Sequence, residues 1–77
     1  MQLKKIFKIG TRVIIDPESD GWLEPPVGVV VGGPFVIETV LGTDYNYNIK
    51  FDTSQQDESG DGPYSMAEIL SRYITAL

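Results

Sequence analysis

Oxygen-bearing residues recur at a regular spacing in the acidic stretch near the end of the chain. Counted from Asp57, the third, fifth, ninth and twelfth positions carry a side-chain oxygen, the sixth is glycine, and the seventh offers a backbone carbonyl. These positions hold Asp57, Ser59, Asp61, Gly62, Pro63, Ser65 and Glu68. Calcium is coordinated by several oxygen ligands at once, and a glycine permits the sharp turn that such a loop needs. The spacing therefore makes this stretch a candidate calcium site.

The stretch resembles the calcium-binding loop of EF-hand proteins, and the resemblance implies that Glu68 would close the site with both carboxylate oxygens from an exiting helix. The preceding residues 45–52 have a strand pattern instead of an entering helix, so the match is to a strand–loop–helix relative. In the preferred alternative, Ser65 and Glu68 cap a helix and the Asp- and Gly-rich residues form a solvated loop. Calcium is therefore a secondary hypothesis, and the main prediction includes no cofactor.

A second candidate site is the proline-flanked loop of residues 16–26, which places one tryptophan among four carboxylates. An aromatic anchor surrounded by acids is suited to a basic or Pro-rich peptide, because the ring supplies contact area and the acids select Lys or Arg. In the alternative interpretation, the tryptophan completes a small core, and this is the more usual fate of a large aromatic in a short chain. The candidate partner-binding residues are Trp22, Asp16, Glu18, Asp20 and Glu24.

The composition excludes several kinds of chemistry. The 77 residues contain no histidine and no cysteine, which rules out Ser-His-Asp and Cys-His nucleophiles as well as the usual zinc ligands. We therefore expect a protein that is not an enzyme. The net charge of −5 makes a nucleic-acid backbone an unlikely main partner, since phosphate binding needs a basic face. No signal-like or membrane-spanning apolar stretch is present, and we expect a cytoplasmic protein without a membrane partner.

Hydrophobic alternation predicts four strands, at about residues 5–16, 27–31, 35–41 and 45–52. Turns at residues 32–34 and 42–44 would connect the last three, and the four strands together indicate an antiparallel meander. An acidic loop at residues 53–62 would lead into a helix at about 65–75, where apolar residues recur at helical spacing. A competing interpretation keeps only a short helical turn at 65–70 and makes residues 72–77 a fifth strand.

Four sequence segments resemble those of SH3-like small β-barrels, especially bacterial and KOW-like variants. They are Lys-Ile-Gly-Thr-Arg-Val at 8–13, Val-Gly-Val-Val-Val-Gly at 27–32, Ile-Lys-Phe-Asp at 49–52 and Tyr-Ser-Met-Ala-Glu-Ile-Leu at 64–70. The resemblance covers nearly the whole chain. It implies a single domain over residues 1–77, mainly β, folded as a small antiparallel barrel of four to five strands with a short C-terminal helix.

These observations favour a protein-interaction module or small adaptor subunit that binds a basic or Pro-rich segment of a protein partner through the loop of residues 16–26. One alternative is a small acidic inhibitor that presents carboxylates where nucleic-acid phosphates would lie. Another is a domain stabilised by calcium through residues 57–68. The partner and the oligomeric state are left open by the sequence.

Overall fold

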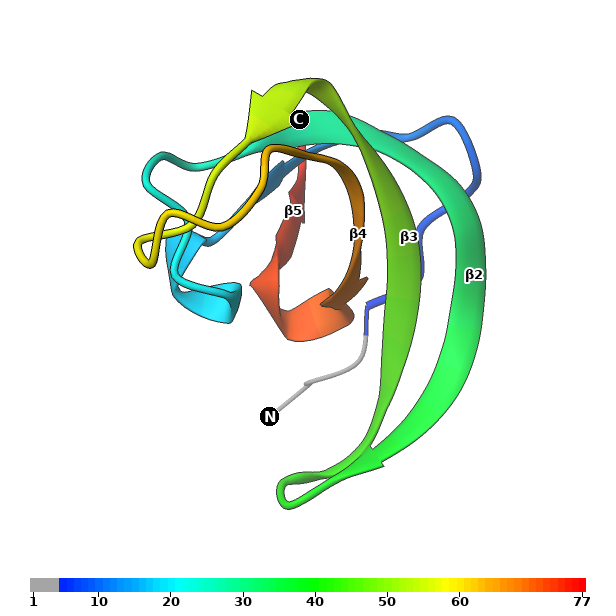
Figure 1. The fold of residues 1–77 in the computed structure, drawn as a ribbon. Helices are drawn as coiled ribbons and strands as arrows, with labels where there is room; N and C mark the ends of the chain where they lie inside the picture. The colour runs from blue at the N-terminus through cyan, green and yellow to red at the C-terminus, as the bar shows by residue number, and fades with distance from the viewer. Residues whose placement is uncertain (1–4) are drawn as a thin grey trace.

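The computed structural model describes residues 5–77 and arranges them as one antiparallel sheet (Figure 1). The order of strands across the sheet is β4-β3-β2-β1-β5. The strands are β1 (Arg12–Ile15), β2 (Val27–Thr39), β3 (Gly42–Gln55), β4 (Tyr64–Leu70) and β5 (Ile74–Ala76). Short 3₁₀ turns, η1 (Pro17–Ser19) and η2 (Ser71–Tyr73), lie in two of the connections. The predicted mainly β class is confirmed. No helix within residues 5–77 is long and apolar enough to cross a membrane.

Strands β1 to β4 follow one another across the sheet as an antiparallel meander, and the longest of them, β2 and β3, form its central hairpin. The turn predicted at residues 32–34 is wrong, because the two strands predicted at 27–31 and 35–41 are one strand with register shifts around Gly32. A Cβ atom on Gly33 would lie 2.8 Å from the carbonyl oxygen of Asn46, and Gly33 has a φ of +105°. Glycine therefore lets β2 bend here while it stays paired with β3.

The turn of the hairpin lies at Val40 and Leu41 instead of at residues 42–44. The hydroxyl of Thr39 accepts a hydrogen bond from the Leu41 amide at 3.1 Å and donates one to the Gly42 carbonyl at 2.7 Å. A threonine side chain that satisfies turn backbone groups in this way fixes the position of the turn. The segment predicted as 45–52 consequently begins earlier, at Gly42, and runs on to Gln55.

The predicted C-terminal helix at 65–75 is wrong, because these residues form β4, η2 and β5. Ile69 is 1% exposed and pairs with Tyr47, while Ala67 pairs with Ile49. An isolated helix of this length is marginal in water, whereas the open edge of β3 supplies both backbone partners and a buried place for Ile69. Of the competing interpretation, the fifth strand is present, at Ile74–Ala76, and the helical turn at 65–70 is not.

The first predicted strand, 5–16, is shorter than expected. Of residues 5–16, only Arg12–Ile15 form a strand, because the backbone turns at residues 8–11. The amide and hydroxyl of Thr11 both donate to the Lys8 carbonyl, at 3.1 and 2.6 Å, and Gly10 has a φ of +95°. The alternation predicted over residues 5–16 places Ile9 on the same face as Val13 and Ile15, which are buried, but Ile9 is 67% exposed.

The core lies on the concave side of the curled sheet and draws on all five strands and the first long loop. Tyr47 is fully buried, and its hydroxyl accepts a hydrogen bond from the Phe7 amide at 2.9 Å and donates to the Lys5 carbonyl at 3.2 Å. These bonds attach the residues before β1 to β3. The buried hydrophobic residues are Val13, Ile15, Trp22, Val30, Tyr47, Ile49, Phe51, Ile69 and Ile74.

A buried carboxylate links β3 to the turn η2. Asp44 has no exposed surface; it accepts hydrogen bonds from the Ser71 hydroxyl and the Tyr45 amide, and its Oδ2 lies 2.9 Å from Nε of Arg72. Arg72 also donates to the Thr39 hydroxyl at 3.0 Å. Burial raises the pKa of Asp44, but the hydrogen bonds from Ser71 and Arg72 outweigh burial and leave the pKa below its ordinary value. This pair was assigned no role by the sequence, where Asp44 was placed in a turn.

Substitution of Gly28 tests how closely β2 and β3 approach. A Cβ atom there would lie 2.3 Å from the carbonyl oxygen of Lys50, which belongs to the backbone and cannot rotate away. We expect Gly28→Ala to lower the free energy of unfolding by about 2 kcal/mol or more, measured by urea denaturation. Gly32→Ala is the matched control, because its Cβ would meet the side-chain amide of Asn48, which can move. Equal losses in the two variants would contradict the argument.

Candidate functional site

Backbone contacts join the two acidic loops that the sequence presented as separate sites. Trp22 and Asp57 form an isolated antiparallel bridge. On one side of it, the Glu58 amide donates to the Gly21 carbonyl at 2.8 Å, and on the other the Leu23 amide donates to the Gln56 carbonyl at 3.3 Å. The bridge brings the first loop against the second, and Asp20 lies close enough to Asp57 for the two charges to interact. The two candidate sites therefore form one surface.

Each loop is also ordered by its own carboxylate. Asp16 caps η1 by accepting a hydrogen bond from the Glu18 amide at 2.9 Å. In the second loop Oδ1 of Asp57 accepts from the Ser59 amide at 3.0 Å, the Ser59 hydroxyl at 2.6 Å and the Asp61 amide at 3.0 Å. The Ser59 hydroxyl is the largest influence on the pKa of Asp57 and, with these backbone amides, lowers it despite partial desolvation. Asp57 is therefore held as an anion in a fixed position.

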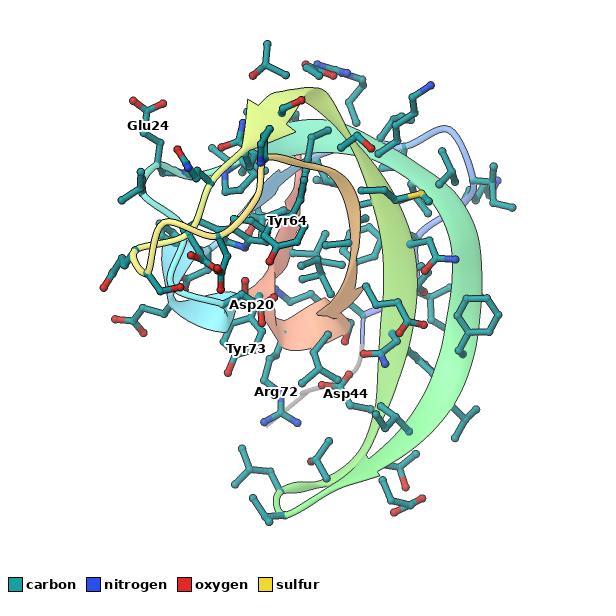
Figure 2. All side chains as sticks on the ribbon, viewed as in Figure 1. Asp20, Glu24, Asp44, Tyr64, Arg72 and Tyr73 are labelled. Carbon is teal, nitrogen blue, oxygen red and sulfur yellow. The ribbon has the colours of Figure 1, made fainter. Side chains whose placement is uncertain are left out.

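A pocket of about 310 Å³ lies where the joined loops meet β4. Trp22 forms one wall and is only 4% exposed; its ring contacts those of Phe51 and Tyr64 edge to face, with centroids 5.3 and 5.9 Å apart. The indole nitrogen of Trp22 donates to the Ser19 hydroxyl at 3.2 Å, which fixes the ring. Asp20 and Tyr64 face each other across this region in Figure 2. The lining residues are Asp20, Trp22, Asp57, Tyr64, Met66 and Ala67.

Negative charge is concentrated at the pocket. Desolvation, followed by the charges of Asp61, Asp57 and Asp20, raises the pKa of the Tyr64 hydroxyl. Burial, together with the charge of Asp57, raises the pKa of Asp20. Within residues 5–77 the ion pairs are Arg12–Asp52 and Arg72–Asp44, neither of which involves a carboxylate at the pocket. A cation entering the pocket would therefore be attracted to carboxylates that form no ion pair with a basic side chain of residues 5–77.

The other predicted partner-binding residues do not converge on this pocket. Asp16, Glu18 and Glu24 are exposed and do not line it, and Glu24 points outward on the far side of its loop (Figure 2). Trp22 is a core residue, as the alternative interpretation had it, and presents only part of its ring to the pocket. Of the five residues proposed from the sequence, Asp20 and Trp22 therefore lie at the site.

The candidate calcium ligands are divided between the second loop and β4. Asp57, Ser59 and Asp61 share one turn, where the Ser59 hydroxyl also lies 3.3 Å from Oδ2 of Asp61. Pro63 precedes β4, while Ser65 and Glu68 lie on β4 with exposed side chains, Glu68 opposite Asn48. The expectation that Glu68 closes the loop from an exiting helix is wrong, since a strand follows the loop. Residues 5–77 hold no cluster of three or more Asp, Glu, His or Cys side chains arranged for a metal ion.

Three pocket residues were not anticipated as site residues. Tyr64 had been placed just before the helix predicted at 65–75, and Met66 and Ala67 in its first turn. Tyr64 and Met66 are alternate residues of β4 and so point to the same side of the strand. Reading this segment with a period of two would have placed both beside the acidic loop. Together they add an aromatic ring and a thioether to the carboxylates.

Comparisons with known proteins give no relationship from which a role could be taken. No family model matches the chain, and no curated protein or solved structure matches it. A small pocket with aromatic walls and unneutralised carboxylates is suited to a cationic group, which both the ring faces and the charges attract.

Proposed function

We propose that the chain folds as an SH3-like barrel. The support is that β1 pairs with β5, so the first and last strands are neighbours. The two edge strands of the sheet, β4 and β5, are also joined by only three residues, Ser71–Tyr73, so the end of one edge lies close to the start of the other. A curled sheet whose two edges approach each other has the arrangement of a small, nearly closed barrel.

The proposed function is that of a non-enzymatic interaction module that binds a basic segment of a protein partner. The observation that carries this proposal is that Asp20 and Asp57 line the same pocket, together with the aromatic rings of Trp22 and Tyr64. The aliphatic stem of a Lys or Arg side chain would lie along Met66 and the rings, while its charged head would reach the two carboxylates. Of the basic and Pro-rich partners expected from the sequence, this chemistry favours the basic one.

The position of the pocket supports recognition of an extended peptide. Its residues come from two loops, which the bridge between Trp22 and Asp57 joins, and from the strand β4. Since the loops are already hydrogen-bonded to each other, little conformational entropy would be lost when a peptide binds. The cation would be held in a fixed place and the flanking peptide would lie across the exposed surface of β4.

Titration calorimetry with a Lys- and Arg-rich peptide tests the proposal through Asp20→Asn. Asp20 is exposed and is the pocket carboxylate with the smaller part in ordering its loop, so the variant removes a charge and leaves the fold intact. We expect the Kd of the peptide to rise about fivefold, as the loss of one partly solvated charge contact implies. Added salt should weaken binding by the wild type more than by the variant.

Glu24→Gln is the matched control. It removes the same charge from the same loop, but Glu24 points away from the pocket (Figure 2). Its Kd is expected to stay within about twofold of the wild type, since a distant surface charge is screened. Equal weakening by Asp20→Asn and Glu24→Gln would indicate attraction to net charge alone. Wild-type protein that fails to bind the basic peptide, or that binds a peptide of the same length with Pro in place of the basic residues equally well, would overturn the proposal.

A further inference from the structure

The outer edge of β2 is unpaired over the half of the hairpin that extends beyond the rest of the sheet. Strand β1 pairs with β2 only at Val27–Val29, and backbone bonds from Gly10 and Thr11 end at Val30. Within the described chain no strand or backbone hydrogen bond continues along this side of β2 from residue 31 to 39. Figure 1 shows this part of β2 and β3 as a protruding two-stranded arm.

This arm is unusually apolar for an exposed strand pair. Residues 27–43 contain one charged side chain, that of Glu38. Phe35 is 47% exposed and Val36 is 70% exposed, and at the tip Val40 and Leu41 are more than half exposed. Soluble proteins usually protect a strand edge with charges, especially Lys, or cover it. An edge with one acid and several exposed apolar side chains is suited to pairing with another strand.

The main-chain groups that such a pairing would use follow from the position of the turn. The pair Thr39–Gly42 closes the hairpin around two residues, and hydrogen-bonded and non-bonded pairs alternate from there along β2 and β3. Ile37, opposite Asp44, bonds to β3, whereas Val36 and Glu38 direct their N–H and C=O groups away from it. These four groups form the free edge.

We propose that this edge pairs with the same edge of a second copy of the chain, antiparallel and centred on Ile37. In that register Val36 lies opposite Glu38 of the second copy, and the outward groups of both residues form four hydrogen bonds. Ile37 lies opposite its own counterpart, and Phe35 lies opposite Thr39, so β-branched and aromatic side chains pair across the junction. Two five-stranded sheets then become one continuous sheet with a two-fold axis.

Charge placement fixes the orientation of the second copy. A parallel arrangement would bring the Glu38 carboxylates of the two copies side by side, and like charges at opposed positions are destabilising. The antiparallel register places each carboxylate opposite a valine and separates the two acids. Pro34 lacks an N–H donor and limits the pairing to about residues 35–39. The short contact makes a weak dimer, with a Kd on the order of 100 µM.

Sedimentation equilibrium from about 10 µM to 1 mM protein, compared between the wild type and Val36→Pro, tests the proposal. The substitution removes an N–H that faces solvent in the monomer, where an edge strand tolerates proline, and that is bonded in the dimer. Because both copies carry the substitution, the dimer loses two hydrogen bonds. We therefore expect its Kd to rise at least about tenfold. Val36→Thr, which keeps the N–H and the branched Cβ, is expected to change it less than about threefold.

Each other result decides against the proposal. A wild type that remains monomeric at 1 mM removes it, as does a dimer equally stable in the wild type and Val36→Pro. A loss of similar size in Val36→Thr would assign the contact to apolar side chains instead of the main chain. If Val36→Pro fails to fold, amide exchange of the wild type decides: protection of the Val36 and Glu38 amides must increase with protein concentration, and protection independent of concentration overturns the pairing.

Discussion

Asp44→Ala is expected to lower the free energy of unfolding by about 3–5 kcal/mol. The carboxylate has no exposed surface, and its removal leaves the guanidinium of Arg72, whose side chain is 16% exposed, without the anion it faces. The Tyr45 amide and the Ser71 hydroxyl would each lose an acceptor as well. Unsatisfied buried donors and an unpaired buried charge are among the costliest defects in a small domain. Urea denaturation at neutral pH measures the loss.

Asp52→Ala is the control for this prediction, because Asp52 also pairs with an arginine. The Arg12–Asp52 pair lies on the surface, with side chains that are 51% and 42% exposed. Since solvent already screens these charges, its loss is expected to cost no more than about 1 kcal/mol. Similar losses in Asp44→Ala and Asp52→Ala would mean that burial does not strengthen the dependence of the fold on Asp44.

The contribution of Asp44 should also depend on pH with a defined sign. Its folded-state pKa is lowered from the ordinary value of 3.8, so the folded protein holds this proton less tightly than the unfolded chain does. The associated stability is fully present above the unfolded-state pKa and is lost as the pH falls through the folded-state pKa. We expect the difference in free energy of unfolding between the wild type and Asp44→Ala to shrink below about pH 4. A constant difference down to the acid limit would contradict this account.

Trp22→Ala is expected to destabilise the domain by about 3–5 kcal/mol. The ring is 4% exposed, packs edge to face on both Phe51 and Tyr64, and lies at the bridge that joins the acidic loops. A cavity of that size in a 77-residue chain would remove a large part of its total stability. Thermal denaturation followed by circular dichroism measures the effect.

Leu23→Ala provides the comparison for Trp22→Ala. Leu23 is the next residue along the chain and is 63% exposed, so its truncation should cost less than about 0.5 kcal/mol. If both variants melt near the wild-type temperature, Trp22 is not part of the core. If the loss in Trp22→Ala is as large as expected, binding experiments with that variant would report unfolding, and Asp20→Asn is the substitution that tests the pocket.

The sequence predicts the β class well where alternation is regular and the inward residues are large. Alternation in the strand predicted at 45–52 places Tyr47, Ile49 and Phe51 on one face, and all three are buried. The prediction failed at the C-terminus because Ile69 and Ile74 suit a helical stripe, while the same Ile69 also fits the inward face of a strand. Periodicity describes one segment at a time and does not show that β3 has an open edge. Pairing with that edge made residues 64–70 a strand.

The candidate site was only partly predictable for a different reason. The types of residue were recognised, since both acidic loops and Trp22 were singled out. The contact between the two loops was not predicted, because Asp20 and Asp57 are far apart in sequence and are brought together by the backbone bridge at Trp22. A loop–loop contact made by main-chain groups leaves no pattern in the side chains. The Asp44–Arg72 pair was also not predicted, because the sequence does not show that Asp44 is buried.

The position of Trp22 gives the protein an internal optical probe. It is the single tryptophan of the chain, so excitation near the red edge of protein absorption reports on one indole. That indole is buried in the native state and forms a wall of the pocket beside two carboxylates. Unfolding would shift its emission to longer wavelength as water reaches the ring. A bound cation would instead change the local field around a ring that is still buried, so binding and unfolding would give separable emission changes without any label.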